Sequence, residues 1–179
     1  CLIEEQAGGA HAVGLKQTIL MPFVTLGSLI NFCDCLMAGG TSRKDHSEVG
    51  SSYIHFNFTP NQDKATASLI GDVARGVMLR ERPIFLGGQG GLVGPARVAY
   101  GSVVAAGIVF RENLAEENRL VSAITMGEPR DQQFAPGIYW KVKAKFLNNV
   151  NYIASLIALL RWYESVRALF LEPELVSGA

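Results

Sequence analysis

Two histidines and two neighbouring basic residues have side chains that could bind an anionic substrate and act on it. His46 ends the run Arg43-Lys44-Asp45-His46, and His55 follows nine residues later. A histidine poised near neutral pH can take a proton from an amine, so His46 is the first candidate general base and His55 the second. Either imidazole can equally be a structural hydrogen bonder. Adjacent side chains of a strand point to opposite faces, so Asp45 can orient His46 only if the backbone turns there.

Arg43 and Lys44 have the chemistry to hold a sugar phosphate. A guanidinium makes paired hydrogen bonds to phosphate oxygens, and an ammonium acts as a point charge. The alternative is a solvated corner, since exposed basic residues commonly serve no binding role. Lys64, in a polar stretch that begins at Thr59, either reaches the site of a neighbouring subunit or is solvated.

The elements that position these residues are predicted from a six-residue period. Large apolar residues recur at every sixth position in two runs, most clearly over 20–37 and 92–110: Leu20, Leu26 and Phe32, and then Leu92, Val98, Val104 and Phe110. Six is not a helical period. It fits a parallel β-coil with three flat faces per turn and one inward residue on each face. We therefore predict an all-β solenoid with these residues inside.

Irregular segments interrupt this repeat. Cys1–Gln17 is predicted to form an irregular or partial first coil, followed by about four coils with loops at Thr59–Ser68 and Arg80–Gly91. The predicted division is a solenoid over residues 1–112 and, over 113–179, a connection with a C-terminal helical extension.

The helix is expected within Asn148–Phe170 and is expected to end at Pro173. One apolar stripe comprises Val150, Ile153, Ile157 and Leu160, and Leu156, Leu159, Tyr163 and Phe170 add a second. A helix with two apolar stripes needs cover on two sides, from the solenoid, another subunit or both.

Composition excludes several classes of protein. Hydrophobic residues make up 49% of the 179 residues and charged ones 18%, which argues against disorder. Sixteen basic and sixteen acidic side chains leave no net charge, so no nucleic acid is expected. The longest apolar run, Ile153–Leu160, is far short of a bilayer span, and no membrane association is expected.

The three cysteines favour a reducing cytoplasm because they cannot all pair, and Cys33 and Cys35 are too close along a strand to bridge each other. The Cys33-Asp34-Cys35 run lacks the second pair of ligands of a zinc site. We expect no metal.

Several runs resemble the left-handed β-helix acetyltransferases over roughly Leu20 to Glu112. The matching runs are Leu69-Ile70-Gly71-Asp72-Val73, Leu92-Val93-Gly94-Pro95-Ala96 through Ala105-Ala106-Gly107, and Phe110-Arg111-Glu112. The sequence is most similar to the acetyltransferase domain of bacterial bifunctional enzymes that acetylate glucosamine 1-phosphate and form UDP-N-acetylglucosamine. The resemblance implies a left-handed coil and a homotrimer. It also implies acetyl-coenzyme A lying along the solenoid. Ala105, Ala106 and Gly107 are small enough for its pantetheine arm to lie against the backbone, although corner packing alone would also require small residues, and Arg111 is a further candidate contact.

Three local matches carry the resemblance to the active site. Asn31-Phe32 falls where the family has an Asn-Phe pair, Arg43-Lys44-Asp45-His46 falls near its basic residues and catalytic histidine, and Asn57-Phe58 followed by Lys64 is similar to its Asn-Tyr-Asp-Gly-x-Asn-Lys loop. His46 stands only eleven residues before Asn57, about two hexads closer than in the family. This spacing leaves open whether His46, His55 or neither is the base.

The resemblance implies a cytoplasmic acyltransferase that uses acetyl-coenzyme A on an amino-sugar phosphate or nucleotide sugar. His46 would be the base, Arg43 and Lys44 would hold phosphate, and Asn57 and Lys64 would complete the pocket. The rival interpretation is a non-catalytic solenoid that binds a sugar nucleotide or trimerises a larger protein related to UDP-N-acetylglucosamine pyrophosphorylases.

Overall fold

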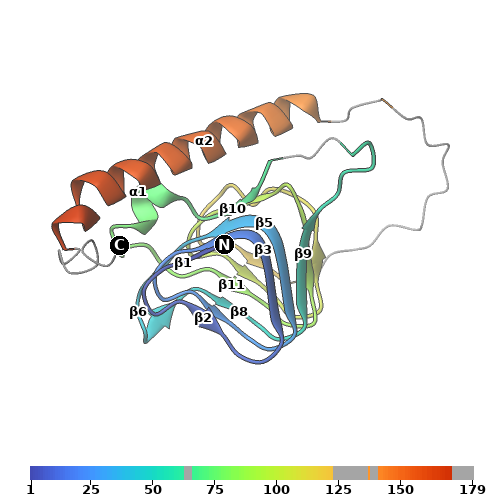
Figure 1. Ribbon diagram of the computed structural model, residues 1–179. Helices are drawn as coiled ribbons and strands as arrows, with labels where there is room; N and C mark the ends of the chain where they lie inside the picture. Colours follow the sequence, from blue (N-terminus) through green and yellow to red (C-terminus); the bar gives the residue numbers. More distant parts are fainter. Residues whose placement is uncertain (63–65, 123–136, 138–140, 171–179) are drawn as a thin grey trace.

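The computed structural model describes residues 1–62, 66–122, 137 and 141–170. Parallel strands form a stack, and a long C-terminal helix crosses it (Figure 1).

One sheet has six short strands, one from each level of the stack. In the order of the chain they are β2 (Gly8–Gly9), β4 (Thr25–Leu26), β8 (Glu48–Val49), β11 (Phe85–Leu86), β14 (Val103–Val104) and β16 (Leu120–Val121). Each strand pairs in parallel with the strand of the level before or after it.

A second sheet has eight strands and bends around a corner. It comprises β1 (Leu2–Ile3), β3 (Val13–Leu20), β5 (Ile30–Met37), β9 (Tyr53–Asn57), β10 (Ser68–Ile70), β12 (Gly91–Gly94), β13 (Arg97–Val98) and β15 (Val109–Phe110). Within β3 and β5 the chain turns at Gln17 and Asp34, whose φ angles of 49° and 57° are left-handed. The first half of β5 pairs with β9 and its second half with β10, so this sheet supplies two of the three sides.

The register of these strands fits a repeating coil. Leu2 pairs with Ile19 and Gly8 with Thr25, a separation of 17 residues in each case. Near the other end, Gly91 pairs with Val109, a separation of 18 residues. Three strands in about 18 residues amount to one turn of three six-residue sides, so the arrangement is compatible with a β-solenoid.

The predicted inward positions form the core. Leu20, Leu26, Phe32, Leu92, Val98, Val104 and Phe110 are all buried. They lie in rows across neighbouring levels, because Leu26 pairs with Val49, which pairs with Leu86. The six-residue period therefore identified the inward side correctly.

The number and limits of the coils differ from the prediction. The six-stranded sheet has more levels than the roughly four coils expected. Of the two alternatives for Cys1–Gln17, an irregular or a partial first coil, the second agrees with the structure, where this segment contributes β1, β2 and the start of β3. Pairing also continues past Glu112, where Leu114 bridges to Val98 and β16 pairs with β14. Two-residue strands carry too little local pattern to be recognised, and only their pairing defines them.

Three insertions leave the stack. The first is the antiparallel hairpin of β6 (Gly40–Ser42) and β7 (Asp45–His46), and the second is the predicted loop between β9 and β10. The third lies between β10 and β11 and contains the short helix α1 (Val73–Gly76), which is capped by the Asp72 side chain. The loop predicted at Arg80–Gly91 is thus misplaced, because Phe85 and Leu86 return to the stack beside Glu48 and Val49.

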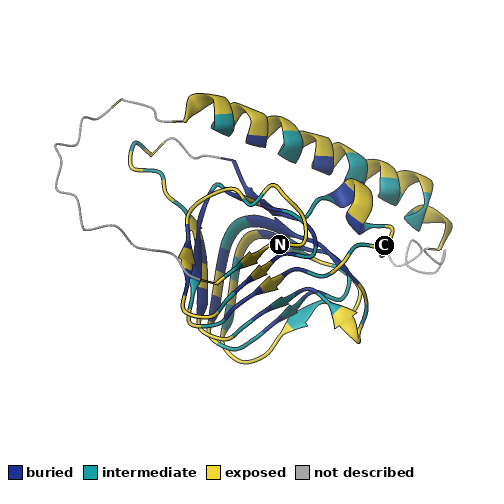
Figure 2. Ribbon diagram, turned by 180° about the vertical axis from the view of Figure 1, so that it is seen from behind, coloured by how far each residue is buried: buried dark blue, intermediate teal, exposed yellow. Residues whose placement is uncertain are grey.

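The C-terminal helix α2 spans Val142–Ser165, beginning six residues before the predicted Asn148, and a 3-10 turn, η1 (Arg167–Leu169), follows it. Pro173 lies outside the described residues. Leu159 joins the core cluster, and Tyr152, Ala158 and Tyr163 pack against that cluster. Most of α2 is coloured as exposed in Figure 2. Within the described chain, no helix has the length and apolar character needed to cross a membrane.

Candidate functional site

The hairpin β6–β7 carries three of the predicted site residues, and glycines make its sharp exit from the stack. Gly39 and Gly40 have φ angles of 113° and 88°, a region that favours glycine, and a Cβ on Gly40 would lie 2.7 Å from the Cα of His46. Ser47 anchors the base of the hairpin. Its hydroxyl donates to the Ala38 carbonyl at 3.0 Å and accepts from the Ile84 backbone N–H at 2.9 Å.

His46 is held in one orientation by the turn of this hairpin. Its Nδ1 lies 2.9 Å from the Arg43 carbonyl oxygen. A carbonyl only accepts, so Nδ1 carries a proton, and Nε2 is the acceptor nitrogen whenever the ring is neutral. Nε2 lies 3.8 Å from Glu48 Oε2, and the His46 side chain is 22% exposed. The ring is thus held with Nε2 on the side of the Glu48 carboxylate, and in the neutral tautomer this nitrogen could accept a proton as a general base does.

Asp45 does not orient His46. Its carboxylate accepts a hydrogen bond from the Thr41 hydroxyl at 3.1 Å, across the hairpin. This agrees with the alternation of side chains along a strand. The Arg43 carbonyl takes the orienting role instead, which no side-chain motif could reveal because every residue has a carbonyl.

Arg43 borders an open groove of about 550 Å³. The other lining residues come from the first two levels of the stack: Gln6, Ala7, Gly8, Gly9, Ala10, Thr25 and Leu26. Arg43 Nη1 donates to the Gln6 carbonyl at 3.0 Å, which holds the guanidinium at the rim. Lys44 is exposed at the turn, where its backbone N–H donates to the Ser42 hydroxyl. The hairpin therefore brings Arg43, Lys44 and His46 close together, and of these three Arg43 lines the groove.

His55 has a different environment, because it occupies an inward position of the stack. Phe32 pairs with His55 and His55 with Leu92, so its side chain stands in a core row and is fully buried. Nδ1 donates to the Cys33 carbonyl at 2.6 Å, and Nε2 lies 2.8 Å from the Ser68 hydroxyl, which is its donor. Burial lowers the pKa of His55 to about 4. Both nitrogens are engaged away from solvent, which favours a structural role.

Asn57 lies at the end of β9 and holds the following loop. Its side-chain amide donates to the Thr66 carbonyl at 2.8 Å, and its carbonyl oxygen lies 3.5 Å from the Ser68 hydroxyl. Asn57 therefore belongs to the same network as His55, not to the hairpin. Lys64 lies outside the described residues.

The residues predicted to contact coenzyme A form an open corner between β14 and β15. Ala106, Gly107 and the nearby Arg111 are exposed, and Ala105 is half-buried. A Cβ added to Gly107 would meet no atom within 4 Å. The corner is therefore open to solvent at Gly107.

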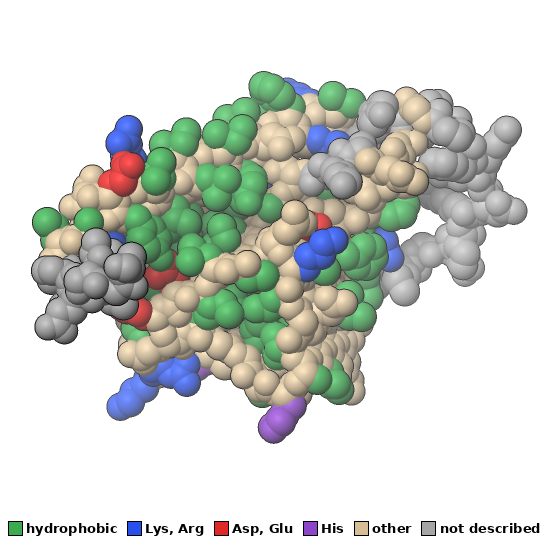
Figure 3. Space-filling view, in the orientation of Figure 1, with side chains coloured by type: hydrophobic (Ala, Val, Ile, Leu, Met, Phe, Trp, Pro, Cys, Tyr) green, Lys and Arg blue, Asp and Glu red, His purple; other side chains and the backbone are tan. Residues whose placement is uncertain are grey.

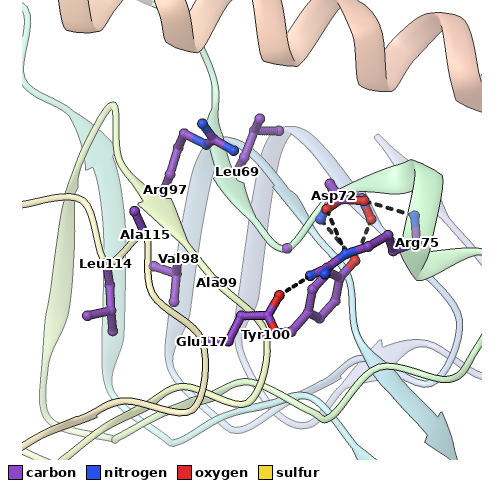
Figure 4. A pocket seen from close by; sticks show the side chains of 11 residues that line it. Leu69, Asp72, Arg75, Arg97, Val98, Ala99, Tyr100, Leu114, Ala115 and Glu117 are labelled. Carbon is purple, nitrogen blue, oxygen red and sulfur yellow. Dashed lines mark hydrogen bonds and ion pairs between the residues drawn. The ribbon is translucent and has the colours of Figure 1, made fainter.

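A second cavity, of about 220 Å³, contains none of the predicted residues (Figure 4). Arg75 dominates it. Its guanidinium lies 4.6 Å from the centre of the Tyr100 ring and 2.6 Å from Glu117, and it also pairs with Asp72 and Glu81. The sequence offered one local signal, the spacing of Asp72 and Arg75 on a helical turn. Glu117 is 42 residues from Arg75, and only the fold brings the two together.

Among the described residues, no three His, Cys, Asp or Glu side chains gather closely enough to hold a metal ion. Cys33 and Cys35 are both free thiols. Comparison with known proteins found neither a family model nor a curated protein that matches this chain.

Proposed function

We propose that this protein is an acyltransferase that moves the acetyl group of acetyl-coenzyme A to the amine of an amino-sugar phosphate or nucleotide sugar. The observation that carries the proposal is the His46 imidazole. The Arg43 carbonyl orients the ring through Nδ1, Nε2 is proposed to be the basic nitrogen, and the Arg43 side chain from the same hairpin lines a groove.

The proposed fold is a left-handed parallel β-helix of hexapeptide repeats, with the hairpin, loops and C-terminal helix as additions. The buried six-residue rows and the separations of 17 or 18 residues between levels support it. The resemblance to hexapeptide acetyltransferases supports the hand of the coil and a homotrimer, with each site completed by a neighbouring subunit. Free cysteines fit the cytoplasmic location proposed with them.

In the proposed reaction, His46 Nε2 takes a proton from the substrate amine while the amine nitrogen attacks the thioester carbon. The new C–N bond forms and the C–S bond breaks. The coenzyme A thiolate leaves with the bonding electrons and receives a proton from the imidazolium. An N–H donor near the reacting carbonyl would stabilise the developing oxyanion.

Binding roles follow the charges. Arg43 and Lys44 hold the substrate phosphate at the groove, and the corner Ala105-Ala106-Gly107 accepts the pantetheine arm with Arg111 close to its phosphates. Asn57, at the end of β9, and Lys64, further along the chain, are proposed to complete the pocket of a neighbouring subunit in the trimer.

Acetyl transfer to glucosamine 1-phosphate tests the base directly. His46→Ala should lower kcat/KM on the order of 10²-fold or more with little change in the folded structure, because the imidazole lies outside the core. His11→Ala is the matched control, since His11 is another histidine outside the core, and it should retain activity. Full activity of His46→Ala would refute the role of His46.

Calorimetry separates the proposal from a non-catalytic module. An acyltransferase should bind acetyl-coenzyme A, and Arg111→Ala should weaken that binding. A module that only presents a sugar-nucleotide pocket or trimerises a larger protein would bind the sugar nucleotide alone. Absence of acetyl-coenzyme A binding at millimolar concentration would overturn the enzyme assignment in favour of that module.

A further inference from the structure

Helix α2 carries a row of exposed apolar side chains with the spacing of a coiled coil. Phe146, Val150, Ile153, Ile157 and Leu160 follow one another at intervals of four, three, four and three residues. All five are exposed; Phe146 is 65% and Ile157 56% accessible. Alternating steps of four and three place them along one line of an α-helix, where a second helix can insert its own side chains. We call these five residues the outer stripe.

The opposite side of α2 packs against the rest of its own chain. Asn148 and Ser155 are buried, and they lie seven residues apart on the side facing away from the outer stripe. Leu159 belongs to the core cluster on this inner side. Helices at the surface of a monomer normally bury their apolar face and expose their polar face. In α2 two of the three buried residues are polar, and the apolar row faces outward.

The outer stripe is long enough for a specific interface. From Phe146 to Leu160 it extends for about 21 Å along the helix axis. Leu147, Leu156 and Val142, also exposed, widen it. Figure 3 shows hydrophobic side chains gathered along α2 on the face in view. Monomeric proteins seldom expose a continuous apolar patch of this extent without a partner.

Charges at the two ends of α2 select the occupant and its direction. Continuing the spacing of the stripe by one step places Lys143 before it and Glu164 after it, and Glu164 also pairs with Arg161 at 2.9 Å. A parallel copy would oppose lysine to lysine and glutamate to glutamate. An antiparallel copy would bring Lys143 of one helix beside Glu164 of the other, which is favourable and consistent with two-fold symmetry.

We propose that a second copy of this chain packs on the outer stripe, with the two α2 helices antiparallel and related by a two-fold axis. The interface does not use the hairpin or the groove. If the stack is itself a trimer, as proposed above, the two-fold contact joins trimers into a hexamer; without trimers it gives a dimer.

Measuring molar mass by light scattering tests this interface. Ile153→Lys, which places a charge at the centre of the stripe, should halve the molar mass and raise the dissociation constant on the order of 10²-fold or more. Met78→Lys is the matched control, because Met78 is 50% exposed and Ile153 is 55% exposed, and it should keep the wild-type mass. Circular dichroism of both variants verifies that the chain is folded.

A charge exchange tests the direction. Lys143→Glu should weaken the antiparallel pair several-fold, and adding Glu164→Lys should restore it. A parallel pair would be insensitive to Lys143→Glu, since one like-charge contact replaces another. An unchanged molar mass in Ile153→Lys would overturn the proposal. It would also be overturned if the wild-type protein remained a monomer or trimer and sedimented with phosphatidylcholine vesicles, because a lipid surface would then be the occupant of the outer stripe. Acetyl transfer is measured in a separate assay, so a failure of the enzyme assignment can be distinguished from a failure of the proposed α2 interface.

Discussion

His55 stands where the neighbouring levels carry Phe32 and Leu92. A polar ring in an apolar row is stable only if each nitrogen has a partner, and the Cys33 carbonyl and the Ser68 hydroxyl supply both. The same burial that removes His55 from solvent favours its neutral form in the folded chain.

This requirement predicts a pH-dependent stability. In the unfolded chain a histidine titrates near pH 6.5, whereas in the folded chain the pKa of His55 is about 4. The unfolded state therefore binds more protons between these values, and the stability present above pH 6.5 is lost as pH falls through 4. The free energy of unfolding should fall by about 3 kcal/mol from this group.

Urea unfolding at pH 7 and pH 4.5 measures the effect. In His55→Leu, which matches the Leu92 of the next level, the free energy of unfolding should depend less on pH over this range. Parallel pH profiles for wild type and variant would contradict the assigned environment of His55.

At the scale of the elements, glycine corners fix how closely successive levels approach. A Cβ on Gly50 would lie 2.3 Å from the backbone nitrogen of Gly88. This contact is with backbone, which cannot rotate away. The corner following β8 thus accepts only glycine without displacing the corner following β11.

Gly50→Ala should consequently lower the free energy of unfolding by about 2 kcal/mol, as overpacking in a tight interior does. Gly8→Ala is the control, because a Cβ at Gly8 meets no atom within 4 Å, and its change should stay within about 0.5 kcal/mol. Chemical denaturation measures both. Equal stability of the two variants would contradict the close stacking of these corners.

At the scale of the whole molecule, the C-terminal helical segment, α2 with η1, contacts the N-terminal residues of the chain. The Tyr163 hydroxyl donates to the Glu4 carboxylate, and Arg167 pairs with Glu5 at 2.9 Å. Burial, with the adjoining Glu4 carboxylate, raises the pKa of Tyr163 to about 12. These contacts hold the helix against the first level of the stack, so the orientation of the outer stripe depends on them.

In the double variant Tyr163→Phe with Arg167→Gln, the free energy of unfolding should fall by about 1 kcal/mol for each contact removed. Hydrogen–deuterium exchange of the α2 amides should become faster, while exchange in β3 and β5 should change little. Arg119→Gln removes another arginine–glutamate pair, with Glu116, and serves as the control. Unchanged exchange in α2 would mean that other contacts hold the helix.

The sequence alone determined which residues point inward along the clear repeats and that a helix follows them. Both properties follow from local periodicity, since a period of six or of 3.6 is visible within one segment of chain. Four residues of the outer stripe, Val150, Ile153, Ile157 and Leu160, were visible in the same way, whereas Phe146 lies before the predicted start of the helix. Arg43, Lys44 and His46 were found because they are neighbours in sequence.

Only the tertiary structure decided which levels stack on one another, because that depends on pairing between strands separated by insertions of unequal length. It placed His55 in a core row and His46 on strand β7 of the hairpin, a distinction that their residue type could not make. It also brought Arg75 to Glu117 and turned the inner side of α2 toward the strands. These outcomes depend on contacts between residues far apart in the sequence, and such contacts are determined only when the whole chain folds.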